Sequence, residues 1–345
     1  MTRPEKLVIF SPGQTFRFVV MIKDREKTMN ENRRILQLWQ EASHARKKSV
    51  LATVVKVEGS SYRRTGARML IVEGGEIAGC VSGGCLERDL IRRASNLNEE
   101  PVLMRYDTRS DSESSEAEIF LETIGLGCEG VIEILLDPKP ERQLAPIKKV
   151  MSDRKKENLT LELPNGVLYR ETLAAPPQLV IFGAGHDAVP LCQMAADVGW
   201  DVTVVDCRSS FPTPAQYFAE ADLFIQSDPE TIFDKLKIDE DSLMVTMTHN
   251  YEHDRIILGE ILARTSPAYI GLLGPRTRSE KLLTSLDPVK VKTNFSKLHF
   301  PVGLDIGGDN PQAIALSILA EMQSVLAGRG GAPLSQRNGP IHVER

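Results

Sequence analysis

Cys80 and Cys85 flank a Ser-Gly-Gly turn in the segment GCVSGGCLE. A thiolate is both a nucleophile and a metal ligand, and unpaired backbone amides can bind an anion. The spacing of the apolar residues after this turn predicts a helix, with Ser82 as N-cap and Gly83, Gly84 and Cys85 in its first turn. The helix dipole would then favour a bound anion and the thiolate of Cys85.

Four interpretations of these cysteines are open. A structural zinc site needs about four ligands, so Cys80, Cys85 and Cys128 (in the segment IGLGCEG) would need His44 or a carboxylate as well. A reversible disulfide between Cys80 and Cys85 is geometrically feasible. Free cysteines are also common in apolar cores. The fourth interpretation, a pocket that combines thiols with an anion-binding turn, suits a ligand with phosphate and with sulfur or metal chemistry.

A second glycine-rich turn lies in LVIFGAGHDAVPLCQMAADVGWDVTVVDCR. Gly183, Gly185 and Ala188 occupy the three small-residue positions of a dinucleotide-binding fingerprint, and Asp206 follows Gly185 by about 20 residues. An acidic residue there can bind a ribose hydroxyl. His186, within the turn, can reach a ligand phosphate or hydrogen-bond the loop. NAD(P), another ligand and a protein contact are all compatible with such a fold.

Further polar residues follow later predicted strands. The segment LLGPRTRSEK carries Arg276 and Arg278, and such a guanidinium pair suits a phosphate or carboxylate, although a solvated helix start is equally consistent. His249 and His253 are four positions apart, a spacing that can bind a metal if a helix has already begun.

The predicted elements that position these residues form two α/β domains. Residues 29–175 are expected to form an N-terminal α/β domain with Gly/Cys-rich loops. Residues 176–330, in which apolar strands alternate with helices, are expected to form a Rossmann-like, doubly wound parallel sheet. Residues 1–28 are expected to be an extension, with Met29 as an alternative start, and residues 331–345 a disordered tail.

Composition narrows the class of protein. The chain has 345 residues, of which 41% are hydrophobic and 26% charged, and a net charge of −5. This mix is typical of a soluble globular protein, and no basic stripe for nucleic acid or membrane-spanning apolar run is present. No signal peptide is recognisable, so we expect a cytoplasmic protein whose cysteines are thiols or metal ligands.

Several motifs together resemble the XdhC/CoxI family, the accessory factors of xanthine dehydrogenase and related molybdenum hydroxylases. They are GCVSGGCLE, VIFGAGHDA, VVDCRSSF, YIGLLGPRTR and GLDIGGDNPQAIALSILAE, in order along residues 30–326. The resemblance implies a non-catalytic chaperone that binds molybdenum cofactor, a molybdopterin with a phosphate and a dithiolene. It implies protection of the cofactor during sulfuration by a cysteine desulfurase, and delivery to the apo-hydroxylase in purine catabolism.

The resemblance carries over to Cys80, residues 82–87, Gly183, Gly185, His186, Asp206 and Arg208. Cys85 is a possible contact to molybdenum, and the cysteine turn is expected to face the mouth of the Rossmann sheet. Glu129 after Cys128 and Asn250 after His249 depart from the family pattern.

An alternative is an NAD(P)-dependent oxidoreductase with a reactive cysteine, supported by the Gly183 turn and Asp206. A docking component of the hydroxylase complex is a third hypothesis. We also expect a homo-oligomer, a dimer, although the sequence itself is silent on oligomeric state.

Overall fold

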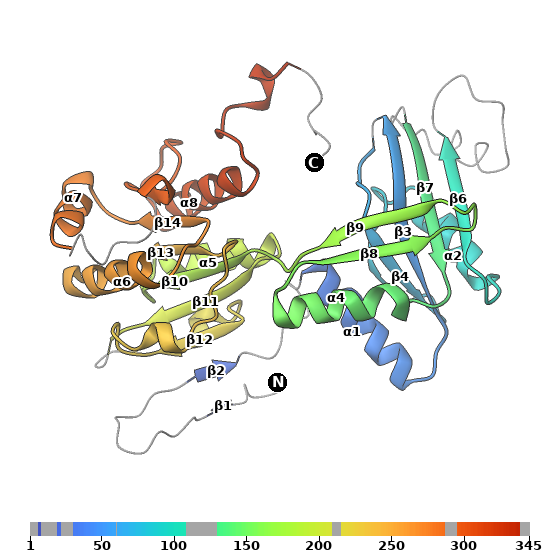
Figure 1. Cartoon of the computed structure of the whole chain (residues 1–345), viewed down its shortest axis with the longest axis horizontal. Helices are drawn as coiled ribbons and strands as arrows, with labels where there is room; N and C mark the ends of the chain where they lie inside the picture. Colours follow the sequence, from blue (N-terminus) through green and yellow to red (C-terminus); the bar gives the residue numbers. More distant parts are fainter. Residues whose placement is uncertain are drawn as a thin grey trace. The chain divides into compact units, whose positions relative to one another are not determined.

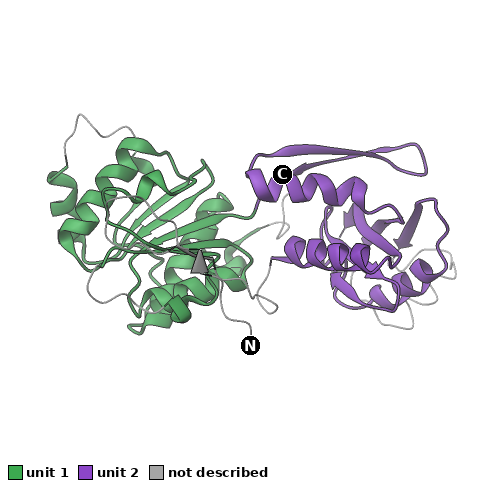
Figure 2. Ribbon diagram, turned by 90° about the horizontal axis from the view of Figure 1, so that it is seen from below, with its two compact units in different colours: residues 1–29, 176–345 green, residues 30–175 purple. Residues whose placement is uncertain are grey.

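The computed structural model divides the chain into two compact units. Unit 1 comprises residues 1–29 and 176–345, and unit 2 comprises residues 30–175 (Figure 2). The structure describes residues 6–7, 19–21, 30–59, 61–107, 130–208, 215–286 and 295–338.

Six parallel strands form the centre of unit 1 (Figure 1), which confirms the predicted parallel sheet. Across the sheet their order is β12-β11-β10-β13-β14-β15, which is the 3-2-1-4-5-6 order of a Rossmann sheet. The point at which the strand order reverses lies between β10 and β13, so loops after these two strands border the usual ligand crevice. The strands are β10 (Gln178–Phe182), β11 (Asp201–Asp206), β12 (Leu223–Gln226), β13 (Leu243–Thr246), β14 (Tyr269–Leu272) and β15 (Leu298–His299).

Helices cover both faces of this sheet. On β10, Leu179 and Ile181 join one apolar cluster, while Val180 and Phe182 join another on the opposite face. The first cluster includes residues of α5 and α8, and the second includes residues of α6 and α7. Burial on both faces explains the continuous apolar run of β10, because each such side chain contributes about 1.5–3 kcal/mol. The helices are α5 (Ala188–Asp197), α6 (Tyr251–Arg264), α7 (Arg276–Thr284) and α8 (Pro311–Leu326).

The N-terminal residues extend the sheet of unit 1. Strand β2 (Val19–Met21) pairs antiparallel with β12, and β1 (Lys6–Leu7) pairs with β2. The segment that we expected to be a separate extension therefore contributes edge strands to the second domain. At the other end, a 3-10 helix, η4 (Leu334–Gln336), lies where the sequence predicts a disordered tail.

Unit 2 is built on an antiparallel sheet of strand order β5-β4-β3-β7-β6. Helix α2 packs on one face, and helices α1 and α4 pack on the other. Strands β8 and β9 form a hairpin, paired from Glu157↔Leu173 to Glu162↔Leu168. The elements are α1 (Glu31–His44), β3 (Ser49–Gly59), β4 (Arg68–Val72), β5 (Ile77–Gly79), α2 (Glu87–Ser95), β6 (Val102–Asp107), β7 (Gly130–Asp137), α4 (Glu141–Asp153), β8 (Glu157–Glu162) and β9 (Leu168–Leu173).

Cys128, which the sequence analysis considered as a zinc ligand, lies outside the described residues, as does the alternative start at Met29. Within the described part of the chain, no helix has the length and apolar character needed to cross a bilayer.

Candidate functional site

The cysteine loop, residues 80–86, connects β5 to α2 in unit 2. The helix begins at Glu87, so Gly83, Gly84 and Cys85 precede it, and the prediction that they form its first turn is wrong. The side chain of Ser82 folds into the loop instead. Its Oγ accepts hydrogen bonds from the amides of Gly84 (3.2 Å) and Leu86 (3.1 Å).

Glu87 holds the cysteine loop from within. Its Oε1 accepts hydrogen bonds from the amides of Val81 (3.3 Å) and Ser82 (2.9 Å), and its Oε2 accepts one from the Ser82 hydroxyl. Burial tends to raise the pKa of the Glu87 carboxyl, but the Ser82 and backbone hydrogen bonds bring it below its ordinary value. Glu87 is therefore ionised at neutral pH, and its carboxylate accepts hydrogen bonds from amides of this loop.

The geometry of the loop disfavours the predicted anion cradle, which remains a prediction. Five loop amides already have acceptors, and an additional negative charge would face the Glu87 carboxylate. Only the amides of Gly83 and Cys85 form no hydrogen bond with the described residues.

Cys80 lies beside a second carboxylate. Its amide donates to Glu31 Oε1 (3.0 Å), its Sγ is 3.6 Å from the same oxygen, and Glu31 forms an ion pair with Arg63. Burial raises the pKa of the Cys80 thiol, Arg63 lowers it, and the negative charge of Glu31 raises it again; the net pKa is above its ordinary value. Cys80 is therefore a protonated thiol at neutral pH.

Cys85 is half-buried and packs against the apolar cluster that contains Leu86 and Leu90. Cys80 and Cys85 are both free thiols. The residues that the structure describes contain no group of three His, Cys, Asp or Glu side chains that could hold a metal ion. The contact of Cys85 with molybdenum remains a prediction.

The glycine turn of unit 1, residues 183–187, has the geometry expected of the fingerprint. Gly183 has φ +124°, and a Cβ there would lie 2.3 Å from the Met247 carbonyl oxygen. Only glycine fits, because β10 and the loop after β13 approach so closely. Ala188 is completely buried at the start of α5, which permits close packing of this helix on the sheet.

Asp206 is in the predicted position at the end of β11, but both oxygens of its carboxylate accept hydrogen bonds from Arg208. Arg208 Nε donates to Asp206 Oδ1 (2.9 Å), and Arg208 Nη2 donates to Oδ2 (2.9 Å). The same Nη2 also donates to the Ala184 carbonyl in the glycine turn (2.9 Å). A guanidinium therefore spans the position at which a dinucleotide ribose would meet the carboxylate.

The turn also carries an acidic side chain of its own. Asp187 Oδ2 is 2.7 Å from His249 Nε2, and a Cβ at Gly185 would lie 2.5 Å from Asp187 Oδ1. His249 precedes α6 with φ +57°, so it does not share a helix face with His253, and the metal-binding spacing does not form. His186 is exposed and makes an edge contact with the ring of Tyr217.

The two arginines of the predicted guanidinium pair make different contacts. Arg278 forms an ion pair of 2.7 Å with the buried carboxylate of Asp254 and therefore serves the packing of α7 on α6. Arg276 is exposed, and its guanidinium lies 5.5 Å from the ring centroid of Phe300. Of the two, Arg276 remains a candidate to bind an anion.

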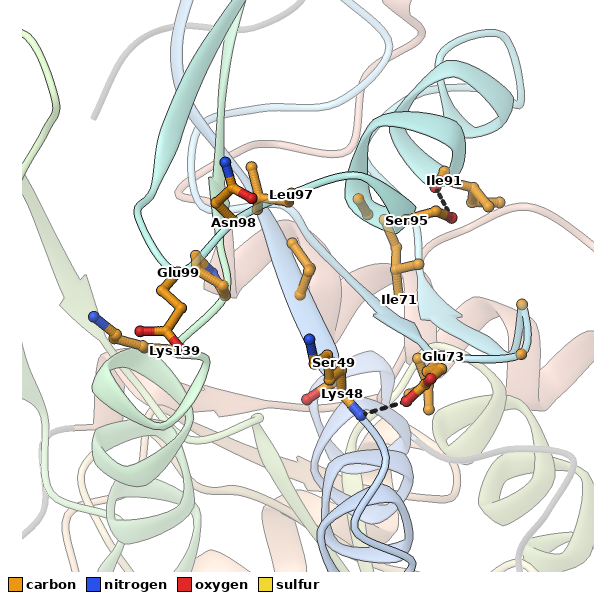
Figure 3. A pocket seen from close by; sticks show the side chains of 16 residues that line it. Lys48, Ser49, Ile71, Glu73, Ile91, Ser95, Leu97, Asn98, Glu99 and Lys139 are labelled. Carbon is orange, nitrogen blue, oxygen red and sulfur yellow. Dashed lines mark hydrogen bonds between the residues drawn. The ribbon is translucent and has the colours of Figure 1, made fainter.

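A cavity of about 710 Å³ lies elsewhere in unit 2, at the C-terminal end of α2 (Figure 3). Its lining includes apolar Val50, Ile71 and Ile91 and the charged residues Lys48 and Glu99. None of the predicted site residues lines it. The cysteine loop lies at the other end of α2, so the cavity and the loop are separate.

The sequence did not single out Glu31, Arg63 or Tyr62, which surround the cysteine loop. Glu31 starts α1, and the other two lie in the turn between β3 and β4. No local pattern links these segments to Cys80, because they meet only through the pairing of β3, β4 and β5 and the packing of α1 against β5.

Comparisons with known proteins match both units. The model of the XdhC and CoxI family matches residues 42–107, and that of the XdhC Rossmann domain matches residues 179–322. A protein of Bacillus subtilis that is named as a probable component of xanthine dehydrogenase is 31% identical over 317 residues, which cover 79% of this chain and 92% of the relative.

Two further proteins are similar over nearly their whole length. The molybdenum cofactor insertion chaperone PaoD of Escherichia coli is 24% identical over 320 residues, which cover 86% of this chain and 89% of PaoD. The crystal structure of a xanthine dehydrogenase from Bacillus halodurans superposes with a TM-score of 0.72 at 28% identity, covering 89% of this chain and 99% of the other.

Proposed function

Because this chain belongs to the XdhC and CoxI family, we propose that it is an accessory protein of xanthine dehydrogenase or a related molybdenum hydroxylase. It binds molybdenum cofactor, supports its sulfuration by a cysteine desulfurase, and delivers it to the apoenzyme. Two similar proteins support this role, since one is named as a component of xanthine dehydrogenase and the other as a molybdenum cofactor insertion chaperone. The observation that carries the proposal is the cysteine loop, a preformed thiol-bearing turn within the matched segment 42–107.

The cysteine loop fits the sulfur-bearing part of the cofactor better than its phosphate. A thiol at Cys80 offers a soft sulfur ligand or exchange partner, whereas Glu31 and Glu87 repel a phosphate. The bound cofactor supplies the molybdenum and dithiolene chemistry. The chain supplies a polar, half-buried position for it, with the Gly83 and Cys85 amides available as hydrogen-bond donors.

A dinucleotide does not fit unit 1 in the usual way. Arg208 already binds both oxygens of the ribose-reading Asp206, and the Asp187 carboxylate lies over Gly185, where a pyrophosphate approaches the backbone. A negative charge at that position repels the pyrophosphate. These two observations favour the accessory role over the NAD(P)-dependent oxidoreductase.

Cofactor transfer tests the proposal. The purified protein is mixed with molybdenum cofactor released from a molybdenum hydroxylase, and the mixture is separated by gel filtration. We expect the pterin, measured by fluorescence after oxidation, to elute with the protein. We also expect the loaded protein, with a cysteine desulfurase and L-cysteine as the sulfur donor, to activate cofactor-free xanthine dehydrogenase. Absence of pterin from the protein fraction contradicts the proposal.

Two cysteine variants test the role of the thiol. Cys80→Ser should reduce retention of the cofactor, whereas Cys207→Ser, which changes a thiol at the end of β11 in unit 1, should leave it unchanged. Equal retention of the cofactor by both variants would show that the Cys80 thiol does not contribute to cofactor binding.

Titration with NADH and NADPH tests the oxidoreductase. Micromolar binding of either nucleotide, together with turnover of a small carbonyl substrate, would favour the enzyme over the accessory protein.

A further inference from the structure

Arginines gather around the cysteine loop. The turn between β3 and β4, residues 61–66, and the segment that holds the loop and α2, residues 80–95, together contain five arginines and two acidic residues. Glu31, which pairs with an arginine of the turn, adds a third carboxylate. The chain as a whole has a net charge of −5, so this region of unit 2 has the opposite sign to the rest of the protein.

The carboxylates of this region are bound to neighbouring groups. Glu87 accepts hydrogen bonds within the cysteine loop, and Glu31 forms its ion pair with the β3–β4 turn. Asp89 is buried and pairs with both Arg92 (2.9 Å) and Arg93 (2.6 Å). None of these three carboxylates is therefore left to neutralise the remaining arginines.

The remaining arginines of this region are Arg64 and Arg88. Both are exposed, and neither guanidinium forms an ion pair or a hydrogen bond with the residues that the structure describes. Arg92 follows Arg88 by one turn of α2 and lies on the same face of the helix, with 71% of its side chain accessible. Because a guanidinium binds a carboxylate through two parallel hydrogen bonds, these side chains suit carboxylates of another molecule.

The turn and α2 contribute to one surface. The ring of Tyr62, two positions before Arg64, contacts the loop: a Cβ at Gly83 would lie 3.6 Å from its Cγ. The loop leads directly into α2, whose second residue is Arg88. A protein interface of ordinary size covers about 800 Å² on each partner, which is enough to include the turn, the loop and the first turns of the helix. Tyrosine and arginine are also the residue types that carry much of the binding energy at protein interfaces.

We propose that these residues, Tyr62, Arg64, Arg88 and Arg92, form an arginine face that docks an acidic surface of the protein that receives the cofactor. On the proposed function, on which this inference rests, that partner is the cofactor-free hydroxylase, because the recipient must approach the cysteine loop and the arginine face borders this loop. A nucleic acid is disfavoured, since the three carboxylates among the arginines repel a continuous row of phosphates. A protein can place single carboxylates opposite the guanidinium groups.

Binding to cofactor-free xanthine dehydrogenase, followed by surface plasmon resonance, tests the arginine face. Arg64→Glu/Arg88→Glu should raise the dissociation constant at least about tenfold, mainly through slower association. Arg64→Gln/Arg88→Gln should have a smaller effect in the same direction, because it removes attraction without adding repulsion. Raising NaCl from about 0.05 to 0.5 M should weaken binding of the parent protein but not of the glutamate variant.

The matched control changes the net charge equally on the opposite side of the sheet. Lys148 lies on α4, which packs on the other face of the sheet from α2, and Lys155 follows this helix; both are exposed. Lys148→Glu/Lys155→Glu should bind the dehydrogenase like the parent protein. A loss as large as that of Arg64→Glu/Arg88→Glu would overturn the inference, because net charge rather than the arginine face would then govern binding.

The outcomes separate this inference from the proposed function. Arg64→Glu/Arg88→Glu should retain the pterin in gel filtration and unfold at the same temperature as the parent protein, yet fail to activate the dehydrogenase efficiently. Equal binding by this variant and the parent protein overturns the arginine face and leaves the accessory role standing. The face is also overturned if the variant loses the pterin, or if it changes only self-association or binding to single-stranded DNA. Parent protein that retains no pterin overturns the proposed function itself.

Discussion

The cysteine loop of unit 2 and the glycine turn of unit 1 resemble each other in sequence and differ in how they are held. Each joins a strand to a helix through glycines, and each has a carboxylate at the start of that helix, Glu87 in one and Asp187 in the other. Glu87 binds the amides of its own loop, whereas Asp187 binds His249 from a loop 62 positions away.

This comparison shows that glycines before a helix do not by themselves make an anion site. The amides must also be vacant and the surroundings must not be negative. In the cysteine loop an internal carboxylate takes the amides, and in the glycine turn a carboxylate lies where the phosphate would approach. The two turns therefore offer a thiol with neutral donors in one case and a His–Asp pair in the other.

The largest effect that distinguishes the turns should come from their glycines. Gly183→Ala places a Cβ 2.3 Å from the Met247 carbonyl oxygen in a left-handed region, and we expect it to lower the free energy of unfolding of unit 1 by about 3–5 kcal/mol. Gly84→Ala in the cysteine loop meets nothing within 4 Å, so only backbone strain of about 1–2 kcal/mol remains. Urea denaturation measures both, and equal losses would show that the close approach at Gly183 is absent.

Removal of the internal carboxylate should be the next largest effect. Glu87→Ala leaves the buried amides of Val81 and Ser82 without an acceptor, which should cost unit 2 about 2–3 kcal/mol. Because the folded pKa of Glu87 is lowered, its stabilisation is complete above the unfolded value of about 4.3 and is lost as pH falls through the folded pKa. Urea denaturation as a function of pH should show the difference between the parent protein and Glu87→Ala shrinking in acid; a constant difference would contradict the ionic role.

A smaller effect concerns the reactivity of Cys80. Because burial and Glu31 raise the pKa of its thiol, alkylation by iodoacetamide should be slow at pH 7 and should rise with pH through values above the ordinary thiol pKa of about 8.5. Glu31→Gln removes a negative charge beside the sulfur and should shift this profile to lower pH. Mass spectrometry of the modified peptide follows Cys80 specifically, and an unshifted profile would show that Glu31 does not influence the thiol.

The smallest effect on stability should come from the glycine turn. The imidazole of His249 is 63% exposed, so Asp187→Ala should change the free energy of unfolding by less than about 1 kcal/mol. The same variant removes the negative charge over Gly185 and should bind inorganic pyrophosphate more tightly than the parent protein in calorimetric titrations. Unchanged pyrophosphate affinity would mean that the Asp187 carboxylate does not repel an anion near Gly185.

Much of the fold could be predicted from local pattern. The parallel sheet of unit 1 follows from continuous apolar strands such as Gln178–Phe182 that alternate with helices, and the hairpin of β8 and β9 follows from its Pro-Asn-Gly turn. The candidate site was less predictable. The helix after the cysteine loop begins later than its N-cap signal indicates, because Ser82 and Glu87 bind loop amides before the helix starts.

The sequence by itself determined the order of the elements, the family and the presence of two glycine-rich turns, since hydrophobic periodicity and glycine placement act over a few residues. Tertiary structure alone decided which groups surround those turns. Glu31 reaches Cys80 through the packing of α1 against β5, Arg208 links Asp206 to the Ala184 carbonyl 24 positions away, and His249 meets Asp187 across neighbouring strands. Charges and hydrogen-bond partners act through space, so their effect on a site depends on contacts that no local segment of the chain contains.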